Sequence, residues 1–292
     1  MSTDEPSGFA LERRSVQRSF SDAARDYDES AILQARVRDE LLDRLQWVRI
    51  EPAVVLDLGS GTGRASAALK RRYRKSRVVA VDMSPGMLTE SARRGTFFHP
   101  LDTVGADAAR LPFRDASVDI VFSNLMLQWC NDPDAVFAEC RRVLRPGGLL
   151  TYTTFGPDTL VELRHAWAAV DEHTHVNRFI DMHDLGDAMV RAGLAEPVMD
   201  VDRITLTYPD ARTLMRDLKA IGAHNVNDGR PRGLTGKTRL SAMIQAYEKF
   251  RRDGKLPATY EIVFGQAWAP TLSRVVTPSG EVRVPISRIG RR

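Results

Sequence analysis

Cysteine is scarce in this sequence: the 292 residues include only Cys130 and Cys140. Two cysteines without C-x-x-C spacing provide neither a disulfide framework nor half of a zinc site, so we expect a protein from a reducing compartment. Histidine is also rare, and His173 and His175 form its one close pair. We therefore expect no bound metal.

Long apolar runs are missing as well. No segment approaches the roughly 20 apolar residues that a membrane-spanning helix needs, and residues 1–10 lack the basic and apolar parts of a secretory signal. We expect a cytoplasmic protein that does not enter a membrane. The content of 43% hydrophobic and 27% charged residues is that of an ordinary globular protein. The net charge of +4 permits an acidic partner, and nothing in the pattern calls for nucleic acid.

The most informative stretch is residues 54–63, with the sequence VVLDLGSGTG. Its apolar start predicts a buried parallel strand, and the periodic residues 65–69 predict a helix after it. Glycines between the two tolerate positive φ and let a ligand approach bare backbone, while the helix N-terminus offers N–H groups to an anion. A turn that merely joins a strand to a helix is the alternative interpretation.

The spacing of these glycines separates two classes of cofactor. A dinucleotide fingerprint, G-x-G-x-x-G or A, needs a small residue where this chain has Arg64, which disfavours an NAD oxidoreductase. Together with Asp57, the run through Gly59, Gly61 and Gly63 reads D-x-G-x-G-x-G. This pattern resembles the first motif of class I S-adenosylmethionine (SAM) methyltransferases, and the resemblance implies SAM as the cofactor.

Strands and helices alternate over residues 54–154, which predicts one doubly wound, mostly parallel α/β sheet of Rossmann-like type. Further strands are predicted at residues 77–82, 118–123, 149–154, 200–208 and 260–268, and a short strand and turn are predicted at 104–108. The sequence LRPGG at 144–148 predicts that the preceding helix ends here, before the fifth strand begins. By resemblance to the class I sheet, which has seven strands, the last strand is expected to insert antiparallel.

Polar residues follow the strand ends, which is where open α/β sheets bind ligands. Asp82 stands about 20 residues past the glycines, as expected of an acid that binds ribose hydroxyls, and Asp107 is placed to accept from an adenine amino group. A simple strand-end acid and a helix cap are the respective alternatives. The full predicted cofactor set is Asp57, Gly59, Ser60, Gly61, Gly63, Asp82, Met83, Met87, Asp107, Ala108, Asn124 and Leu125.

Three segments fall outside the predicted sheet. Residues 11–46 are expected to form two helices, and 155–181 and 209–257 are expected to be helical insertions. In the last of these, Asp210 is a predicted N-cap. We expect the three segments to form a lid over the carboxyl edge of the sheet, within a single domain of residues 11–269. Residues 1–10 are expected to be a disordered leader and 270–292 a basic tail.

Over nearly all of residues 15–268 the chain resembles the malonyl-[acyl-carrier-protein] O-methyltransferases of biotin synthesis. Two departures are Ser60, where some members have cysteine, and the basic tail, which that family's pattern lacks. The more specific motifs lie mostly in the predicted lid: residues 123–125, 128–130, 153–155, 165–167, 170–172, 177–179, 215–216, 218–219 and 221–223, with Phe20 and Tyr27.

The resemblance implies methylation of the free carboxylate of a malonyl thioester, carried by acyl carrier protein or coenzyme A, by a monomeric enzyme. Because this carboxylate is already ionised at pH 7, no general base is needed. Arg178 and Arg216 are the candidates for holding it, and Tyr27 and Gln128 are expected to close the site. A salt bridge elsewhere in the protein is the alternative for each arginine.

Other functions stay open at this point. Another small-molecule methyltransferase, for example one that acts on a quinone ring, would need a base near the acceptor, and no single histidine stands out for that. A respiratory complex I assembly factor that hydroxylates protein arginine shares the core and some motifs. A hydroxylase that used iron would need ligands, and a purely binding or assembly role is the remaining possibility.

Overall fold

The computed structural model describes residues 11–96, 100–221 and 236–271, together with a short strand pair, β8 (Val275–Val276) and β9 (Val282–Arg283). The predicted leader and much of the predicted basic tail lie outside the described residues. The main strands are β1 (Val54–Leu58), β2 (Arg77–Asp82), β3 (Asp102–Gly105), β4 (Val118–Asn124), β5 (Leu144–Phe155), β6 (Ala195–Tyr208) and β7 (Leu256–Trp268).

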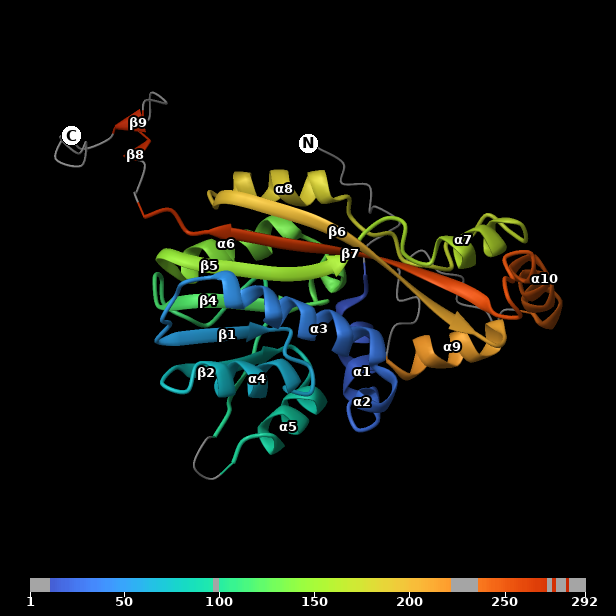
Figure 1. The fold of residues 1–292 in the computed structure, drawn as a ribbon, viewed down its shortest axis with the longest axis horizontal. Helices are drawn as coiled ribbons and strands as arrows, with labels where there is room; N and C mark the ends of the chain where they lie inside the picture. The colour runs from blue at the N-terminus through green and yellow to red at the C-terminus, as the bar shows by residue number, and fades with distance from the viewer. Residues whose placement is uncertain (1–10, 97–99, 222–235, 272–274, 277–281, 284–292) are drawn as a thin grey trace.

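These strands form one seven-stranded sheet in the order β3-β2-β1-β4-β5-β7-β6 (Figure 1). Strands β1 to β5 are parallel to one another, and β7 lies antiparallel between β5 and β6. The predicted doubly wound sheet and its antiparallel insertion are therefore confirmed.

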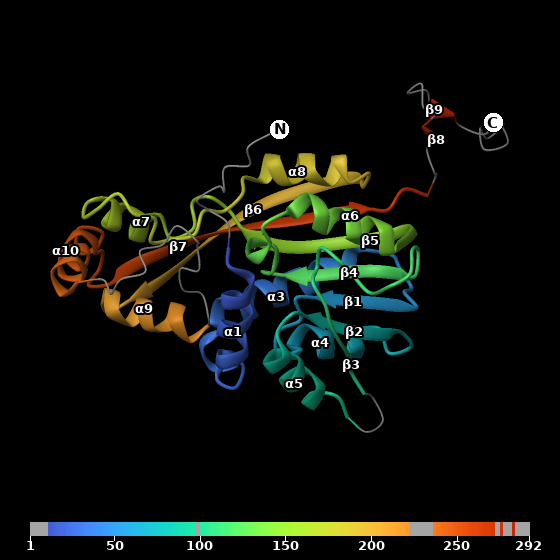
Figure 2. The ribbon, with the colours of Figure 1, turned by 180° about the vertical axis from the view of Figure 1, so that it is seen from behind.

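Helices cover both faces of the sheet because its central strands are apolar on both sides. In β1, Val55 joins one buried cluster, whereas Leu56 and Leu58 join the other. Helices α3 and α4 pack on the first face, and α6 and α8 pack on the second (Figures 1 and 2). The α-helices are α1 (Arg13–Ala23), α2 (Tyr27–Ser30), α3 (Ile32–Arg44), α4 (Arg64–Arg72), α5 (Pro85–Arg93), α6 (Pro133–Val143), α7 (Val161–Ala168), α8 (Met182–Arg191), α9 (Ala211–Ala220) and α10 (Lys237–Glu248).

Local sequence signals set several helix starts. The side chains of Ser84, Asp132 and Asp210 each accept a hydrogen bond from a backbone N–H in the first turn of the helix that follows. Such capping satisfies one of the donors that a helix N-terminus leaves unpaired. The predicted cap at Asp210 is thus confirmed.

Other boundaries differ from the predictions. Residues 144–148, which were expected to separate a helix from the fifth strand, are themselves the start of β5. Leu144 pairs with Val118, and the register then shifts so that Leu149 pairs with Ile120. Gly147 adopts a φ of 78° in this irregularity, a conformation that costs glycine little. Strand β3 covers Asp102–Gly105, so the strand that begins the predicted strand and turn at 104–108 starts two residues earlier.

The segments outside the sheet also differ in detail. Residues 11–46 contain three α-helices rather than two, because α2 is a separate short helix that begins at Tyr27. In 155–181 only α7 is helical. Helices α1, α2, α7, α9 and α10 lie beyond the carboxyl ends of β4 and β5, as Figures 1 and 2 both show. None of the helices in the described ranges is long and apolar enough to cross a membrane.

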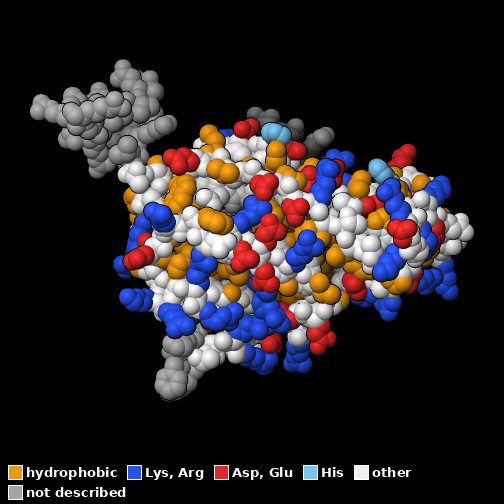
Figure 3. Space-filling view, in the orientation of Figure 1, with side chains coloured by type: hydrophobic (Ala, Val, Ile, Leu, Met, Phe, Trp, Pro, Cys, Tyr) orange, Lys and Arg blue, Asp and Glu red, His pale blue; other side chains and the backbone are white. Residues whose placement is uncertain are grey.

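A band of Lys and Arg side chains covers α4 and the segment after it (Figure 3). It includes the exposed Arg71, Arg72, Arg74 and Lys75. Arg71 and Arg72 lie in the last turn of α4, where positive charge complements the helix dipole, and Arg74 and Lys75 follow it. They lie at the opposite end of that helix from the glycine turn at residues 59–63.

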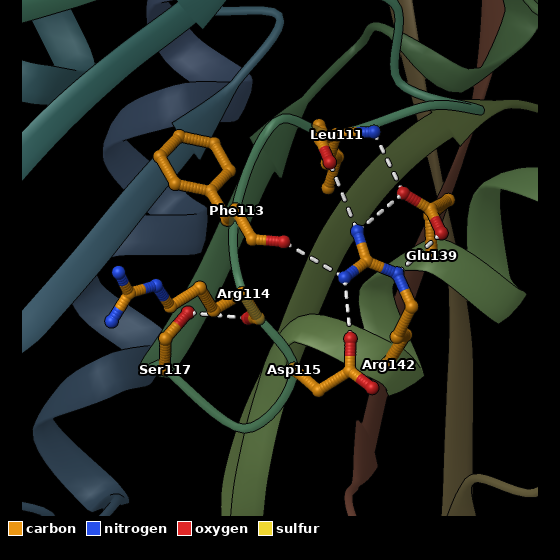
Figure 4. A network of polar contacts seen from close by, with 7 residues as sticks. All are labelled: Leu111, Phe113, Arg114, Asp115, Ser117, Glu139 and Arg142. Carbon is orange, nitrogen blue, oxygen red and sulfur yellow. Dashed lines mark hydrogen bonds and ion pairs between the residues drawn. The ribbon is translucent and has the colours of Figure 1, made fainter.

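Arg142 on α6 fixes the loop that leads from β3 to β4 (Figure 4). Its guanidinium donates to the carbonyl oxygens of Leu111 and Phe113 at 2.9 and 2.8 Å and to the carboxylates of Glu139 and Asp115. Glu139 also accepts from the Leu111 N–H at 2.7 Å, and the Arg142 hydrogen bonds hold the pKa of Glu139 below its ordinary value. One side chain thus anchors both ends of a turn.

We predict that Arg142→Lys lowers the free energy of unfolding by about 1–3 kcal/mol. An ammonium group cannot supply the planar fork of donors that reaches two carbonyls and two carboxylates together. Urea unfolding followed by circular dichroism measures the change. Arg141→Lys, at the neighbouring position, is the control and should unfold like the wild type. Equal stability of the two variants would contradict the role given to Arg142.

Candidate active site

Two adjoining cavities lie at the carboxyl ends of β1, β2 and β4. Their volumes are about 200 and 280 Å³. They share four wall residues, Tyr27, Gly59, Gly61 and Asn124, and so form one continuous site. This is the edge of a parallel sheet at which open α/β folds bind their ligands.

The glycine turn needs its glycines for different reasons. Gly59, Gly61 and Gly63 all have positive φ, between 53° and 80°. A Cβ on Gly59 would collide with Met126, and one on Gly63 would collide with Ser91. A Cβ on Gly61 would meet no protein atom within 4 Å, so at this position the backbone faces the cavity and is open to a ligand.

Two predicted acids line the site: Asp57 in β1 is buried, and Asp82 at the end of β2 is half-buried. Asp57 is 1% exposed and accepts a hydrogen bond of 2.5 Å from the Ser66 hydroxyl. Burial raises the pKa of Asp57 to about 7, against the opposing effect of Ser66. Burial also raises the pKa of Asp82, although its carboxylate accepts from the N–H groups of Gly61 and Ser84. Because both carboxylates are costly to ionise here, the site favours a ligand that brings positive charge.

The rest of the predicted cofactor set surrounds the same space. Asp107 lies in a turn after β3, where it accepts from the Ala109 N–H at 3.1 Å and pairs with Arg13 at 2.5 Å. Eleven of the twelve predicted residues line one or both cavities, and Gly63, which packs on Ser91, does not. The eleven are Asp57, Gly59, Ser60, Gly61, Asp82, Met83, Met87, Asp107, Ala108, Asn124 and Leu125.

Asp28 on α2 fastens the N-terminal helices to the glycine turn. Its carboxylate accepts from the Thr62 hydroxyl at 2.7 Å, pairs with Arg64 at 2.9 Å and also pairs with Arg94. Arg94 donates in addition to the Thr62 carbonyl at 2.6 Å. Arg64 was expected only to disfavour a dinucleotide, and its contact with Asp28 was not predicted, since Asp28, Arg64 and Arg94 are far apart in the chain.

Aromatic side chains close the cavity on the side of α1. The ring of Phe20 meets Trp129 edge-on at 5.1 Å between centroids and lies 6.3 Å from Tyr27. All three line the first cavity. Phe20 and Trp129 were not predicted as site residues, although both belong to the motifs on which the family resemblance rests.

The four predicted catalytic residues are not brought together. Tyr27 lines both cavities, and burial raises the pKa of its phenol. Gln128 donates to the Leu125 carbonyl at 2.6 Å and accepts from Thr154 at 3.1 Å, so it supports the turn after β4 without lining either cavity. Arg178 and Arg216 are both exposed and lie outside these cavities. Their roles stay predictions.

The pair of histidines is used in packing. His175 stacks on Trp167 at 3.7 Å between centroids and bonds Asp171 at 2.7 Å. Within the described part of the chain, no group of three or more His, Cys, Asp or Glu side chains could hold a metal ion.

Comparison with known proteins places this site in a known class. The family model of a methyltransferase domain matches residues 56–152. The YcgJ protein of Bacillus subtilis superposes with a TM-score of 0.56 at 14% identity, covering 80% of this chain and 99% of that one. The [4+2]-cyclase SpnF superposes with a TM-score of 0.51 at 20% identity, covering 81% and 82%. Because structures this distant share the fold alone, they leave the reaction undecided.

Curated relatives are much closer. Malonyl-[acyl-carrier protein] O-methyltransferase of Methylovorus sp. (strain MP688) is 52% identical, covering 93% of this chain and 94% of the relative. The proteins of the same name from Laribacter hongkongensis and Coxiella burnetii are 51% and 40% identical, over 90% and 97% of this chain and 91% and 98% of theirs.

Fold, domain match and site define a class I, SAM-dependent methyltransferase. Within that class, the chain belongs to the malonyl-[acyl-carrier protein] O-methyltransferase family. The residues of the site fit the cofactor. Asp82 can accept ribose hydroxyls, and Asp57 offers negative charge to an ammonium group. The buried Ser60 hydroxyl has no partner among the described residues, as expected of a group that awaits a ligand.

We predict that Asp82→Ala weakens SAM binding about ten- to a hundredfold, since a lost hydrogen bond to a charged group is worth roughly 1.5–3 kcal/mol. Titration calorimetry with SAM and with S-adenosylhomocysteine measures the two dissociation constants. NAD, titrated alongside, should not bind the wild type. An unchanged affinity in the variant would remove Asp82 from the cofactor site, and tighter binding of NAD than of SAM would refute the cofactor class.

We predict that Asp28→Asn weakens SAM binding roughly five- to thirtyfold, because it removes a charged acceptor from two arginines, at a cost of about 1–2 kcal/mol, and loosens the helix that brings Tyr27 to the cavity. Glu29→Gln is the matched control on the same short helix and should bind SAM like the wild type. If the two variants behave alike in calorimetry, Asp28 does not hold the lid.

Proposed function

We propose that the protein transfers the methyl group of SAM to the free carboxylate of malonyl-acyl carrier protein. The observation that carries this proposal is the identity of 52% over 93% of the chain to a relative of that name, because the match extends beyond the cofactor-binding core into α7, α9 and α10. In the family that the sequence resembles, this reaction begins pimeloyl synthesis for biotin.

For this reaction the protein mainly has to position the methyl group of SAM and the acceptor carboxylate. SAM supplies a methyl group on a sulfonium: the bond from carbon to sulfur breaks as the bond from the carboxylate oxygen to carbon forms, which leaves a methyl ester and S-adenosylhomocysteine. The acceptor carboxylate is ionised at pH 7 and needs no base. The protein must hold the reacting atoms about 3–3.5 Å apart and in line.

The aromatic wall of Phe20, Tyr27 and Trp129 is suited to keeping water out of this space. Water would stabilise the separate charges of the sulfonium and the carboxylate, which cancel as the reaction proceeds. We therefore assign to these rings the exclusion of water, and to Tyr27 the closure of the site over the methyl group.

The cations of the cavity walls are already paired. Arg13, Arg38 and Arg64 line the two cavities, and each forms an ion pair with a carboxylate of the chain, from Asp107, Asp39 and Asp28 respectively. A cation that gripped the malonyl carboxylate would stabilise the ground state more than the transition state. The pairing of these arginines supports an acceptor carboxylate that stays weakly held and nucleophilic.

Several finer points belong to the same proposal. We infer that the helices of residues 11–46, 155–181 and 209–257 act as a lid within one domain of residues 11–269. We further infer that malonyl-CoA is an alternative substrate and that the enzyme acts as a monomer. Arg178 and Arg216 are retained as residues that serve the acyl substrate, from positions outside the cofactor cavities.

We predict that the purified protein forms a methyl ester on malonyl-carrier protein in the presence of SAM, with S-adenosylhomocysteine as the second product. Mass spectrometry of the carrier should show a gain of one methylene. Acetyl-carrier protein, which lacks the free carboxylate, is the control and should stay unmodified. Absence of the ester on both malonyl-carrier protein and malonyl-CoA would contradict the proposed function.

A further inference from the structure

A third cavity, of about 490 Å³, lies between α9, the end of β6 and the start of α3. It shares no lining residue with the first cofactor cavity. It is lined by Ser30, Ile32, Leu33, Gln34, Thr205, Leu206, Thr207, Tyr208, Pro209, Thr213, Asp217, Leu218, Ile221 and Tyr260.

This third cavity adjoins the second cofactor cavity. Ile32 and Gln34 line both, and the backbone carbonyl of Gln34 accepts a hydrogen bond of 3.2 Å from the side chain of Asn124, in the wall that the two cofactor cavities share. Ile32 is 69% exposed although it is a large apolar residue. An extended molecule lying in the third cavity would therefore pass over Ile32 and end beside the cofactor.

The walls of the third cavity contain both apolar and polar residues, which suits a ligand that has amide groups along an apolar chain. The lining combines apolar residues such as Leu206, Leu218 and Ile221 with hydroxyl-bearing residues such as Thr205 and Thr207. The side-chain oxygen of Gln34 is buried and accepts no hydrogen bond within the described residues. A buried acceptor without a donor is costly, and a ligand that carries amide N–H groups along an otherwise apolar chain would satisfy it.

We propose that the third cavity is the channel for the pantetheine arm of the acyl substrate, a linear chain with two amides that ends in the malonyl thioester. This inference rests on the proposed function, because the arm belongs to the carrier protein or to coenzyme A. The malonyl group enters the cofactor site past Ile32 and Gln34, and the amides of the arm bond the polar groups of the channel.

One side of helix α9 lines this channel, and another side faces solvent. Thr213, Asp217 and Leu218 line the channel, whereas Arg212, Arg216 and Lys219 line a separate hollow with Asp210, Met215 and Leu240. The second side offers three cations, which complements an acidic carrier protein and steers its approach. Arg216, whose guanidinium donates to Thr213 at 2.9 Å, thus serves the carrier rather than the reacting carboxylate.

The channel also touches the lid. Helix α2 contacts α9, and Ser30, the last residue of α2, lines the channel. The same short helix begins with Tyr27 and holds Asp28, the residue that binds the glycine turn. An arm in the channel would therefore pack against the helix that closes the cofactor site, so that acyl substrate and lid closure favour each other.

The channel is tested by filling it. Thr207 is exposed on β6 and lines the channel, so Thr207→Trp should block the arm without disturbing the core; Leu218→Trp on α9 fills it from the other side. Val198→Trp, at a position on the same strand that is 62% exposed and outside the channel, is the matched control. Steady-state kinetics are measured with malonyl-CoA and with malonyl-N-acetylcysteamine, which carries the same malonyl thioester on a truncated arm.

We expect both filling variants to raise KM for malonyl-CoA at least about tenfold, with KM for the truncated thioester and the dissociation constant of SAM unchanged, because only binding of the arm is lost. The control should match the wild type with both thioesters. Unchanged KM for malonyl-CoA in both filling variants, or equal losses with the two thioesters, would overturn the channel. Failure of the wild type to methylate any malonyl thioester would instead refute the proposed function.

Discussion

The Asp82 carboxylate holds the site together, because it ties the glycine turn after β1 to the start of α5 after β2. It accepts from the N–H groups of Gly61 and Ser84 at 2.9 and 2.8 Å, and both bonds stabilise a charge that burial disfavours. The N-terminal helices are fastened to the same place: Gln17 donates to the Met83 carbonyl at 2.6 Å, and Ser21 bonds Ser84 at 2.9 Å. Cofactor turn, neighbouring helix and lid therefore share one anchor.

The lid has a second attachment in Asp28, and the two attachments differ in kind. At Ser84 the lid meets uncharged groups packed closely enough that a Cβ on Gly86 would strike the backbone of Ser21. At Asp28 it meets two arginines through charge. The proposed lid, held by a tight contact at one point and by ion pairs at another, can open and close about the first. Since α2 also borders the proposed arm channel, binding of the acyl substrate can bias that motion.

The sequence predicted the sheet and most of the residues that line the two cavities at its edge, because both depend on local signals. The apolar run before Gly59 and the acid at Asp82 lie at strand ends that the parallel topology brings to one edge. Contacts between distant segments could not be predicted in this way: Asp28 meets Arg94, and Phe20 meets Trp129, only after the chain has folded. The predicted start of the fifth strand was wrong because Leu144 already pairs irregularly in β5. The proline and two glycines that follow Leu144 favour a turn but do not prevent this pairing. The direction in which Arg216 points depends on how α9 packs, which helical spacing alone does not determine.

In the proposed arrangement, the cofactor cavities and the arm channel form one continuous path that ends at the methyl group of SAM. A crystal structure with S-adenosylhomocysteine and a malonyl-pantetheine amide, in which nitrogen replaces the thioester sulfur, tests this most directly. We expect the ribose hydroxyls on Asp82, the arm between α9 and β6, and the malonyl carboxylate beside Tyr27 and Asn124. An arm that reaches the cofactor by another route, with the space beside Thr207 and Leu218 left open, would contradict the proposed arrangement.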